Sequence, residues 1–225
     1  MHLLEHQAKE LLRDSGVAVP EGTVVTDLSQ LQSGRIALPA VVKSQVPIGG
    51  RGKLGGIRLV HDHDALLTAF QEVKTLAIKG YTPDAVLIET ALDISKELYL
   101  ALRLNRDARR IDVVASSEGG VEIESHTSSV ITRSYDDPST ATDVARALNI
   151  DETACSTLLK KLHACMIDND LLLLEINPLV VTKTGELVAA DCKMLLDDNA
   201  LFRHPAFARQ AVSSSVLALG GTVGV

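Results

Sequence analysis

A glycine-rich run that carries two cations offers the clearest chemistry in this sequence. Residues 41–57 read VVKSQVPIGGRGKLGGI, so a β-branched strand ends at Lys43 and a loop with Arg51 and Lys53 follows. Glycine lets the backbone approach a ligand closely, and successive N–H groups in such a loop form a nest for an anion. A lysine at the strand end adds a positive charge. The run predicts a polyphosphate site, and the alternative is a solvated surface loop.

Two better-known phosphate motifs do not fit this run. A P-loop requires Ser or Thr after its lysine, whereas Leu54 follows Lys53. A dinucleotide fingerprint would open a helix, whereas residues 57–60 read IRLV, which is typical of a strand. We therefore expect a strand, a glycine loop and a second strand that together cover a nucleotide.

A second polar group lies late in the chain and could hold a metal. Glu175 and Asn177 share one face of a predicted strand because side chains alternate with period two. A hairpin through Gly185 is expected to bring Asp191 beside them. Magnesium takes oxygen ligands and usually binds one or two carboxylates together with phosphate and water. These residues predict a magnesium site. The alternative is a buried hydrogen-bond network, with Lys193 as a possible donor, or an Asx turn set by Asn177-Pro178.

Two further carboxylates occur near the middle of the chain. Glu89 ends a predicted buried strand, and Glu97 begins a predicted hairpin. A carboxylate at a strand end beside a nucleotide commonly accepts hydrogen bonds from ribose hydroxyls. Taken alone, a residue such as Glu89 or Glu97 is more often a solvated surface acid.

The composition limits the classes of protein to which this chain can belong. Its 225 residues and hydrophobic content of 46% are enough for a real core in one or two domains. A net charge of −7 and an aromatic content of 3% argue against nucleic-acid or acidic-membrane binding. The three cysteines are widely spaced without a C-x-x-C pair, which indicates free thiols in a reducing compartment. We expect a cytoplasmic or organelle-matrix protein without a membrane span.

The hydrophobic pattern predicts an α+β fold rather than a regular βαβ alternation. Helices are expected over residues 3–16, 62–79, 139–148 and 151–169. Strands are expected over residues 38–43, 57–60, 85–89, 96–104, 111–117, 171–175, 179–182 and 187–191. Residues 212–225 begin like a new strand followed by a glycine-rich turn.

Several of these segments together resemble the ATP-grasp region of the β subunits of succinate–CoA ligases. The matching segments, in chain order, are LLEHQAKELLRDSGVAVPEG, VVKSQVPIGGRGKLGG, SSEGGVEIE, EINPLVVTKTGELVAADCK and DDNALFRHP. The resemblance covers nearly the whole chain. It implies an ATP-grasp fold in which two small α+β subdomains sandwich a nucleotide.

The resemblance also implies roles for individual residues, although none is identified as catalytic. The implied nucleotide-binding residues are Lys43, Gly50, Arg51, Gly52, Glu89, Leu92 and Glu97. Asn177 and Asp191 are the implied magnesium ligands, and ATP with ADP, or GTP with GDP, the implied substrates. Leu92 stands where the family often has a polar residue, and Cys192 where it often has a glycine. Residues 116–124 would lie near an incoming phosphohistidine.

The family's organisation implies domains and a partner. Residues 1–212 would form the ATP-grasp domain, with residues 20–95 as its smaller nucleotide-covering part, and residues 213–225 would begin a further C-terminal domain that is missing here. The implied activity is that of an ADP-forming acid–thiol ligase, shared with an α subunit that binds CoA and carries the phosphohistidine. A malate–CoA ligase or related acyl-CoA synthetase β subunit, or a non-catalytic nucleotide-binding scaffold, stays open as an alternative.

Overall fold

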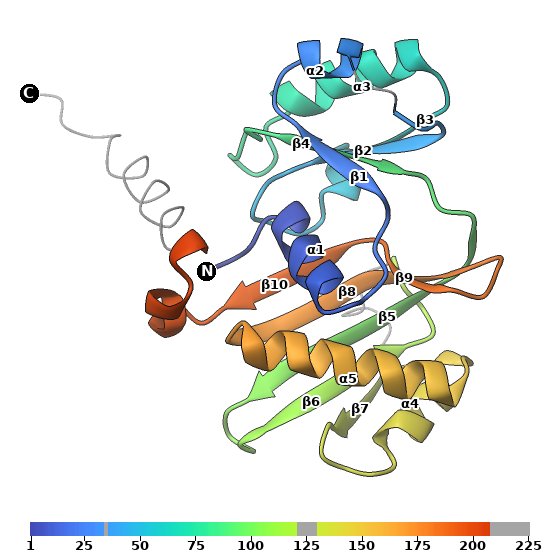
Figure 1. Ribbon diagram of the computed structural model, residues 1–225, viewed down its shortest axis with the longest axis vertical. Coiled ribbons are helices and arrows are strands. Elements are labelled where there is room, and N and C mark those ends of the chain that lie inside the picture. The colour runs from blue at the N-terminus through green and yellow to red at the C-terminus, as the bar shows by residue number, and fades with distance from the viewer. Residues whose placement is uncertain (34–35, 121–129, 208–225) are drawn as a thin grey trace, which may run out of the picture.

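Two antiparallel sheets organise the chain in the computed structural model, which describes residues 1–33, 36–120 and 130–207 (Figure 1). The smaller sheet has the order β1-β4-β2-β3, with β1 (Gly22–Val25), β4 (Val86–Thr90), β2 (Ala40–Ser44) and β3 (Ile57–Val60). The larger sheet has the order β10-β8-β5-β6-β7, with β10 (Cys192–Leu196), β8 (Leu171–Thr182), β5 (Ile94–Asn105), β6 (Arg110–Ser116) and β7 (Val130–Ser134). Strand β9 (Leu187–Ala189) pairs with β8. The predicted α+β class is confirmed.

The smaller sheet buries one face beneath helices α2 (Ser29–Ser33) and α3 (His63–Thr75), which lie together above it (Figure 1). Ala40 and Val42 of β2 point into this core, so alternation turns Val41 and Lys43 to the opposite face. The Asp62 side chain caps α3 by accepting from the N–H of Ala65.

The larger sheet is covered on one face by α4 (Thr140–Leu148) and α5 (Glu152–Asp168), which close the main hydrophobic core (Figure 1). Helix α1 (Glu5–Asp14) lies where the two sheets approach each other and packs on β10 and α5 (Figure 1). Cys155 and Cys165 are buried in this core as free thiols, as expected. Helix α1 thereby connects the layer of the larger sheet to the smaller one.

Some predicted boundaries are wrong. Helix α3 ends at Thr75 rather than near residue 79, because Leu76 is extended and Ile78 pairs with Tyr81 in a short bridge. The two strands predicted on either side of Pro178 are one continuous strand, β8. Its pairing with β5 shifts register between Leu98 and Leu100. The absence of a backbone N–H at Pro178 therefore breaks no hydrogen bond between the two strands.

Other elements were not predicted at all. These are β1, α2, β7 and β10, which are short or carry mixed hydrophobic patterns. The strand expected to begin at residue 212 lies outside the described residues. Within the described part of the chain, no helix is both long and apolar enough to cross a membrane.

Candidate functional site

A cleft of about 1460 Å³ separates the two sheets and is the natural candidate for a binding site. All the residues singled out by the sequence as nucleotide or metal ligands line it: Lys43, Gly50, Arg51, Gly52, Glu89, Leu92, Glu97, Asn177 and Asp191. They come from β2, the glycine loop, β4, β5, β8 and the β9–β10 junction. The fold thus brings together residues that are up to 148 positions apart, from Lys43 to Asp191.

Six charged side chains meet where helix α1 touches both sheets, and we call them the buried ion-pair cluster. Its members are the cations Lys9, Lys43 and Arg51 and the carboxylates Glu5, Glu89 and Asp191. Five of them are nearly inaccessible to solvent, whereas the side chain of Asp191 is 26% exposed and faces the cleft. Three positive and three negative charges balance, which is what burial of so much charge requires.

Glu5 is the centre of the cluster. Its carboxylate lies 2.8 Å from Lys9 Nζ, 2.9 Å from Lys43 Nζ and 2.7 Å from Arg51 Nη1. Burial alone raises the pKa of this carboxyl, but the charges of Lys43, Arg51 and Lys9 outweigh burial and hold the pKa well below its usual value. Glu5 is therefore ionised throughout the physiological pH range.

Glu5 and Lys9 were missed as site residues. They lie four positions apart on one face of α1, a spacing that usually marks a surface pair. The signal in the sequence was their place on the helix face that also carries Ala8 and Leu12, both fully buried. Charged residues on an apolar helix face call for buried partners.

Lys43 and Glu89 bind each other in this structure. Lys43 Nζ lies 2.6 Å from Glu89 Oε2, and it also donates to the carbonyl oxygen of Ala190 at 2.6 Å. Lys9 Nζ donates hydrogen bonds to both carboxylate oxygens of Glu89, at 2.5 and 2.7 Å. Burial lowers the pKa of Lys43, but Glu5, Glu89 and Asp191 raise it above its ordinary value. The phosphate role of Lys43 and the ribose role of Glu89 stay predictions.

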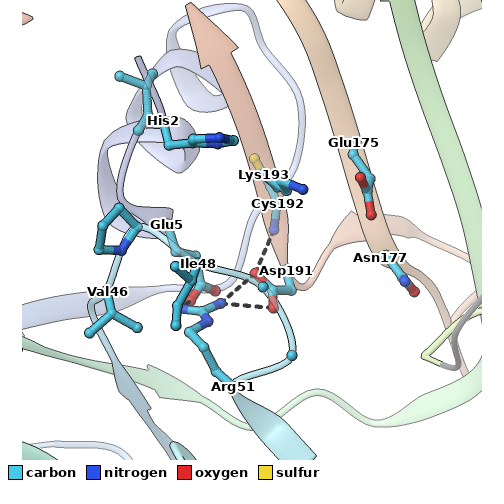
Figure 2. Close-up of a pocket in the computed structure, with 14 residues that line it drawn as sticks. His2, Glu5, Val46, Ile48, Arg51, Glu175, Asn177, Asp191, Cys192 and Lys193 are labelled. Carbon is cyan, nitrogen blue, oxygen red and sulfur yellow. Dashed lines mark hydrogen bonds and ion pairs between the residues drawn. The ribbon is translucent and has the colours of Figure 1, made fainter. Parts of the chain in front are cut away.

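Arg51 reaches from the glycine loop to the metal-ligand candidate. Its Nη2 donates to both carboxylate oxygens of Asp191 at 2.7 and 2.8 Å (Figure 2). Its Nη1 donates to the carbonyl oxygen of Ser44 at 2.8 Å. Burial lowers the pKa of the guanidinium, but Asp191 and Glu5 outweigh it and raise the pKa. The side chain is only 6% exposed, so Arg51 is a fixed buried cation.

Asn177 lies on β8, and Asp191 lies beside that strand, immediately before β10 begins (Figure 2). The N–H of Asn177 donates to the carbonyl oxygen of Asp191 at 3.1 Å, which fixes their spacing. Asn177 Oδ1 accepts from the N–H of Gly120 at 2.6 Å and keeps a second lone pair. Among the described residues no three His, Cys, Asp or Glu side chains form a metal-ligand group.

Amide and carboxylate oxygens on one wall of a polar cleft suit magnesium, which needs few protein ligands when phosphate supplies others. The Asn177 and Asp191 pair therefore fits this ion.

Glu175 lies on the same strand face as Asn177, as the alternation predicts, and both point towards the cavity (Figure 2). Lys193 is its partner across the β8–β10 ladder. Burial, followed by the negative charge of Glu175, raises the pKa of Tyr99 to about 12. Glu175 thus adds negative charge to the metal-ligand wall of the cleft.

Glu97 and Leu92 lie further along the cleft. The carbonyl oxygen of Glu97 accepts from the N–H of Gly119 at 3.0 Å, which ties the start of β5 to residues 116–120. Leu92 joins an apolar wall made by residues that the sequence did not single out, namely Val41, Ile57, Leu59 and Ile94. The segment at residues 116–124, expected near a phosphohistidine, lies partly outside the described residues.

Comparison with known families gives a clear result. The model of the ATP-grasp domain matches residues 2–181, which is most of the chain. This chain belongs to the ATP-grasp family. The resemblance seen in the sequence motifs and the predicted fold are therefore confirmed.

Two curated relatives of this ATP-grasp chain carry the same name. The β subunit of the ADP-forming succinate–CoA ligase of Thioalkalivibrio sulfidiphilus is 41% identical over 92% of this chain and 60% of its own length. The same subunit from Aquifex aeolicus is 40% identical over 91% of this chain and 58% of its own length. The chain thus spans about three fifths of these relatives.

Solved structures share the fold. A dinucleotide-forming acetyl-coenzyme A synthetase from Ca. Korarchaeum cryptofilum, in complex with coenzyme A and Ca-AMPCP, superposes with a TM-score of 0.74 at 18% identity, covering 87% of this chain and 93% of its own. The ATP citrate lyase from Methanothrix soehngenii reaches a TM-score of 0.65 at 22% identity, covering 89% of this chain and 52% of its own. At these identities the likeness establishes the fold.

Proposed function

We propose that this ATP-grasp chain is the nucleotide-binding part of an ADP- or GDP-forming acid–CoA ligase of the succinate–CoA ligase β type. One observation carries the proposal: the glycine loop and the Asn177–Asp191 pair, far apart in sequence, line a single cleft of about 1460 Å³, which is large enough to admit a nucleotide. The names of the curated relatives support the reaction class. The overall reaction would convert succinate, CoA and ATP to succinyl-CoA, ADP and phosphate.

The cleft offers complementary walls for each part of a nucleotide. Arg51 and Lys43 provide positive charge beside the glycine loop, where Gly50 has the positive φ of 77° that lets backbone N–H groups converge on phosphate. The apolar wall with Val41, Leu59 and Leu92 would flank the base. Glu97, which is exposed, would accept hydrogen bonds from ribose hydroxyls, and Glu89 would do so only after release from Lys9 and Lys43. The residues of this chain would thus bind and orient the nucleotide.

Asn177 and Asp191 would hold magnesium against the phosphates. The ion would neutralise negative charge that develops on the transferring phosphoryl group. The residues of this chain would contribute by positioning. Arg51 on one side of the phosphates and the oxygens of Asn177 and Asp191 on the other would orient the terminal phosphate. A partner α subunit with a phosphohistidine and a CoA site would complete turnover, in the cytoplasm or the mitochondrial matrix.

Two alternatives keep the nucleotide site but change its use. A malate–CoA ligase or related acyl-CoA synthetase β subunit would differ only in the acid that is activated. A non-catalytic scaffold would share the fold, but the chain retains Lys43, Asn177 and Asp191 at the cleft, which favours a working nucleotide site.

Calorimetric titration tests the proposal. The protein is titrated with ADP and with GDP, each with magnesium and with EDTA, and the same series is run on Asp191→Ala. We expect saturable, magnesium-dependent binding of one nucleotide, and loss of the magnesium dependence in the variant, whose fold is checked by circular dichroism. Absence of binding by the folded wild-type protein would refute a self-sufficient nucleotide site.

A further inference from the structure

The two terminal nitrogens of the Arg51 guanidinium, Nη1 and Nη2, bind partners that differ in burial. Nη1 is bound to Ser44 O and lies 2.7 Å from Glu5 Oε2, and both of these partners are buried. Nη2 holds Asp191, whose side chain is exposed to the cleft by 26%. One side of the guanidinium is therefore anchored in the protein interior, and the other side faces a partner that a ligand can reach.

The guanidinium thus donates to both carboxylate oxygens of Asp191, and the N–H of Cys192 also donates to Oδ1 at 2.7 Å, so a magnesium ion would have to compete with Arg51 for this carboxylate (Figure 2). A metal ion that takes Asp191 leaves Nη2 of a 6% exposed guanidinium without its anion. Such a loss is costly, because a buried charge must stay paired. A phosphate oxygen that arrives with the metal can replace Asp191 on Nη2, since a guanidinium N–H makes charge-assisted hydrogen bonds to carboxylate and to phosphate oxygens alike.

We propose that the Arg51–Asp191 ion pair is an exchangeable lock that makes metal binding depend on phosphate. In this exchange Asp191 passes from Arg51 to the metal, and Arg51 passes from Asp191 to the nucleotide phosphate. Glu5 and Ser44 keep the guanidinium in place during the exchange, so Arg51 acts as a positioning residue for the metal ligand as well as a phosphate ligand. The inference rests on the proposed function and adds a rule of specificity: the Asn177–Asp191 site disfavours magnesium that arrives without a phosphate group.

The charge balance of the buried ion-pair cluster favours an exchange of partners by Arg51 and Asp191 over binding of magnesium or nucleotide beside an intact ion pair. The cluster is neutral with Asp191 on Arg51. A magnesium–nucleoside diphosphate carries net negative charge, so it brings its own anion for Arg51 while its cation takes Asp191. Free magnesium brings two positive charges to a cluster whose anions are already engaged, and free nucleotide brings phosphate against the carboxylate of Asp191.

The test measures magnesium binding without any nucleotide. Calorimetry with MgCl₂ alone is run on the wild-type protein, Arg51→Ala, Arg51→Lys and the control Arg58→Ala, whose side chain is 49% exposed. Releasing a charge-assisted bond is expected to raise the affinity for free magnesium about 10- to 100-fold in Arg51→Ala. Arg51→Lys keeps the positive charge but loses the hydrogen bonds from Nη2 to both oxygens of Asp191, so its affinity for free magnesium should rise by a smaller factor. Arg58→Ala should match the wild type.

The same variants are then titrated with magnesium and ADP together. Arg51→Ala is expected to bind this pair about tenfold or more weakly, which is opposite in sign to its gain for free magnesium. Equal or weaker free-magnesium binding by folded Arg51→Ala would overturn the lock. A rise in Arg51→Ala without any in Arg51→Lys would also overturn it, because charge alone would then explain the effect.

Failure of the proposed function would look different. A wild-type protein that binds no nucleotide with magnesium refutes the nucleotide site, whereas the free-magnesium series still reports whether Arg51 blocks Asp191. If Arg51→Ala does not fold, Arg51→Lys provides the comparison with the wild type, and unchanged free-magnesium affinity there refutes the lock.

Discussion

Replacement of Glu5 by glutamine gives the sharpest test of the buried ion-pair cluster. The substitution keeps the size of the side chain and removes one negative charge that three cations share at 2.7 to 2.9 Å. Removing one partner of a buried ion pair costs about 3–5 kcal/mol, because the remaining charge is left uncompensated. The cluster of Glu5→Gln would carry one excess positive charge.

The remaining contacts set the expected cost at the lower end of this range. Lys9 and Lys43 keep Glu89, and Arg51 keeps Asp191. No cation is orphaned, so we expect a loss of about 3 kcal/mol in the free energy of unfolding. For a chain of this size this corresponds to a fall in Tm of about 6–12 °C.

Urea denaturation followed by circular dichroism measures the change, with Glu10→Gln as the matched control. Glu10 lies on the same helix but is exposed to solvent, so its replacement should leave stability within about 0.5 kcal/mol of the wild type. The reasoning is refuted if Glu5→Gln and Glu10→Gln have the same unfolding midpoint and the same slope. That result would mean that the cluster contributes no net stabilisation through Glu5.

Three other predictions follow from the same geometry. The stability difference between the wild type and Glu5→Gln should be constant above about pH 5 and shrink as the pH falls, because a carboxyl with a lowered folded pKa loses its contribution once it is protonated; urea titrations from pH 3 to 7 check this, and a difference that grows towards acid contradicts it. Lys43→Ala should weaken ADP binding about tenfold or more both with magnesium and with EDTA, measured by calorimetry, and unchanged affinity would remove its phosphate role. Gly119→Ala should destabilise by about 1–3 kcal/mol, because a Cβ there would lie 2.6 Å from the carbonyl carbon of Leu98, whereas Gly49→Ala meets no atom within 4 Å and should be neutral; equal denaturation midpoints would contradict the expected clash.

The long, strongly patterned elements could be predicted from the sequence. Helix α1, the β5–β6 hairpin and helix α5 were found because their hydrophobic periodicity is sustained over ten or more residues. The short strands β1 and β7 were not, because four or five residues give too little alternation to distinguish a strand from a loop.

The candidate residues of the cleft were likewise visible in the sequence, since glycines with cations and carboxylates beside an asparagine are unusual local patterns. Their meeting in a single cleft was suggested by the family resemblance, and the tertiary structure supplies the distances that bring them together. Their roles in binding stay predictions.

The available side chains, the main helices and strands, and the family could all be recognised before the fold was known. Which charges face one another became clear from the packing of the folded chain. Glu5 and Lys9 look like an ordinary surface pair on α1 until the packing of that helix against both sheets buries them beside Lys43, Arg51 and Glu89. The physical reason is that local pattern reports periodicity and propensity, whereas the pairing of charges depends on burial and on contacts between segments far apart in the chain.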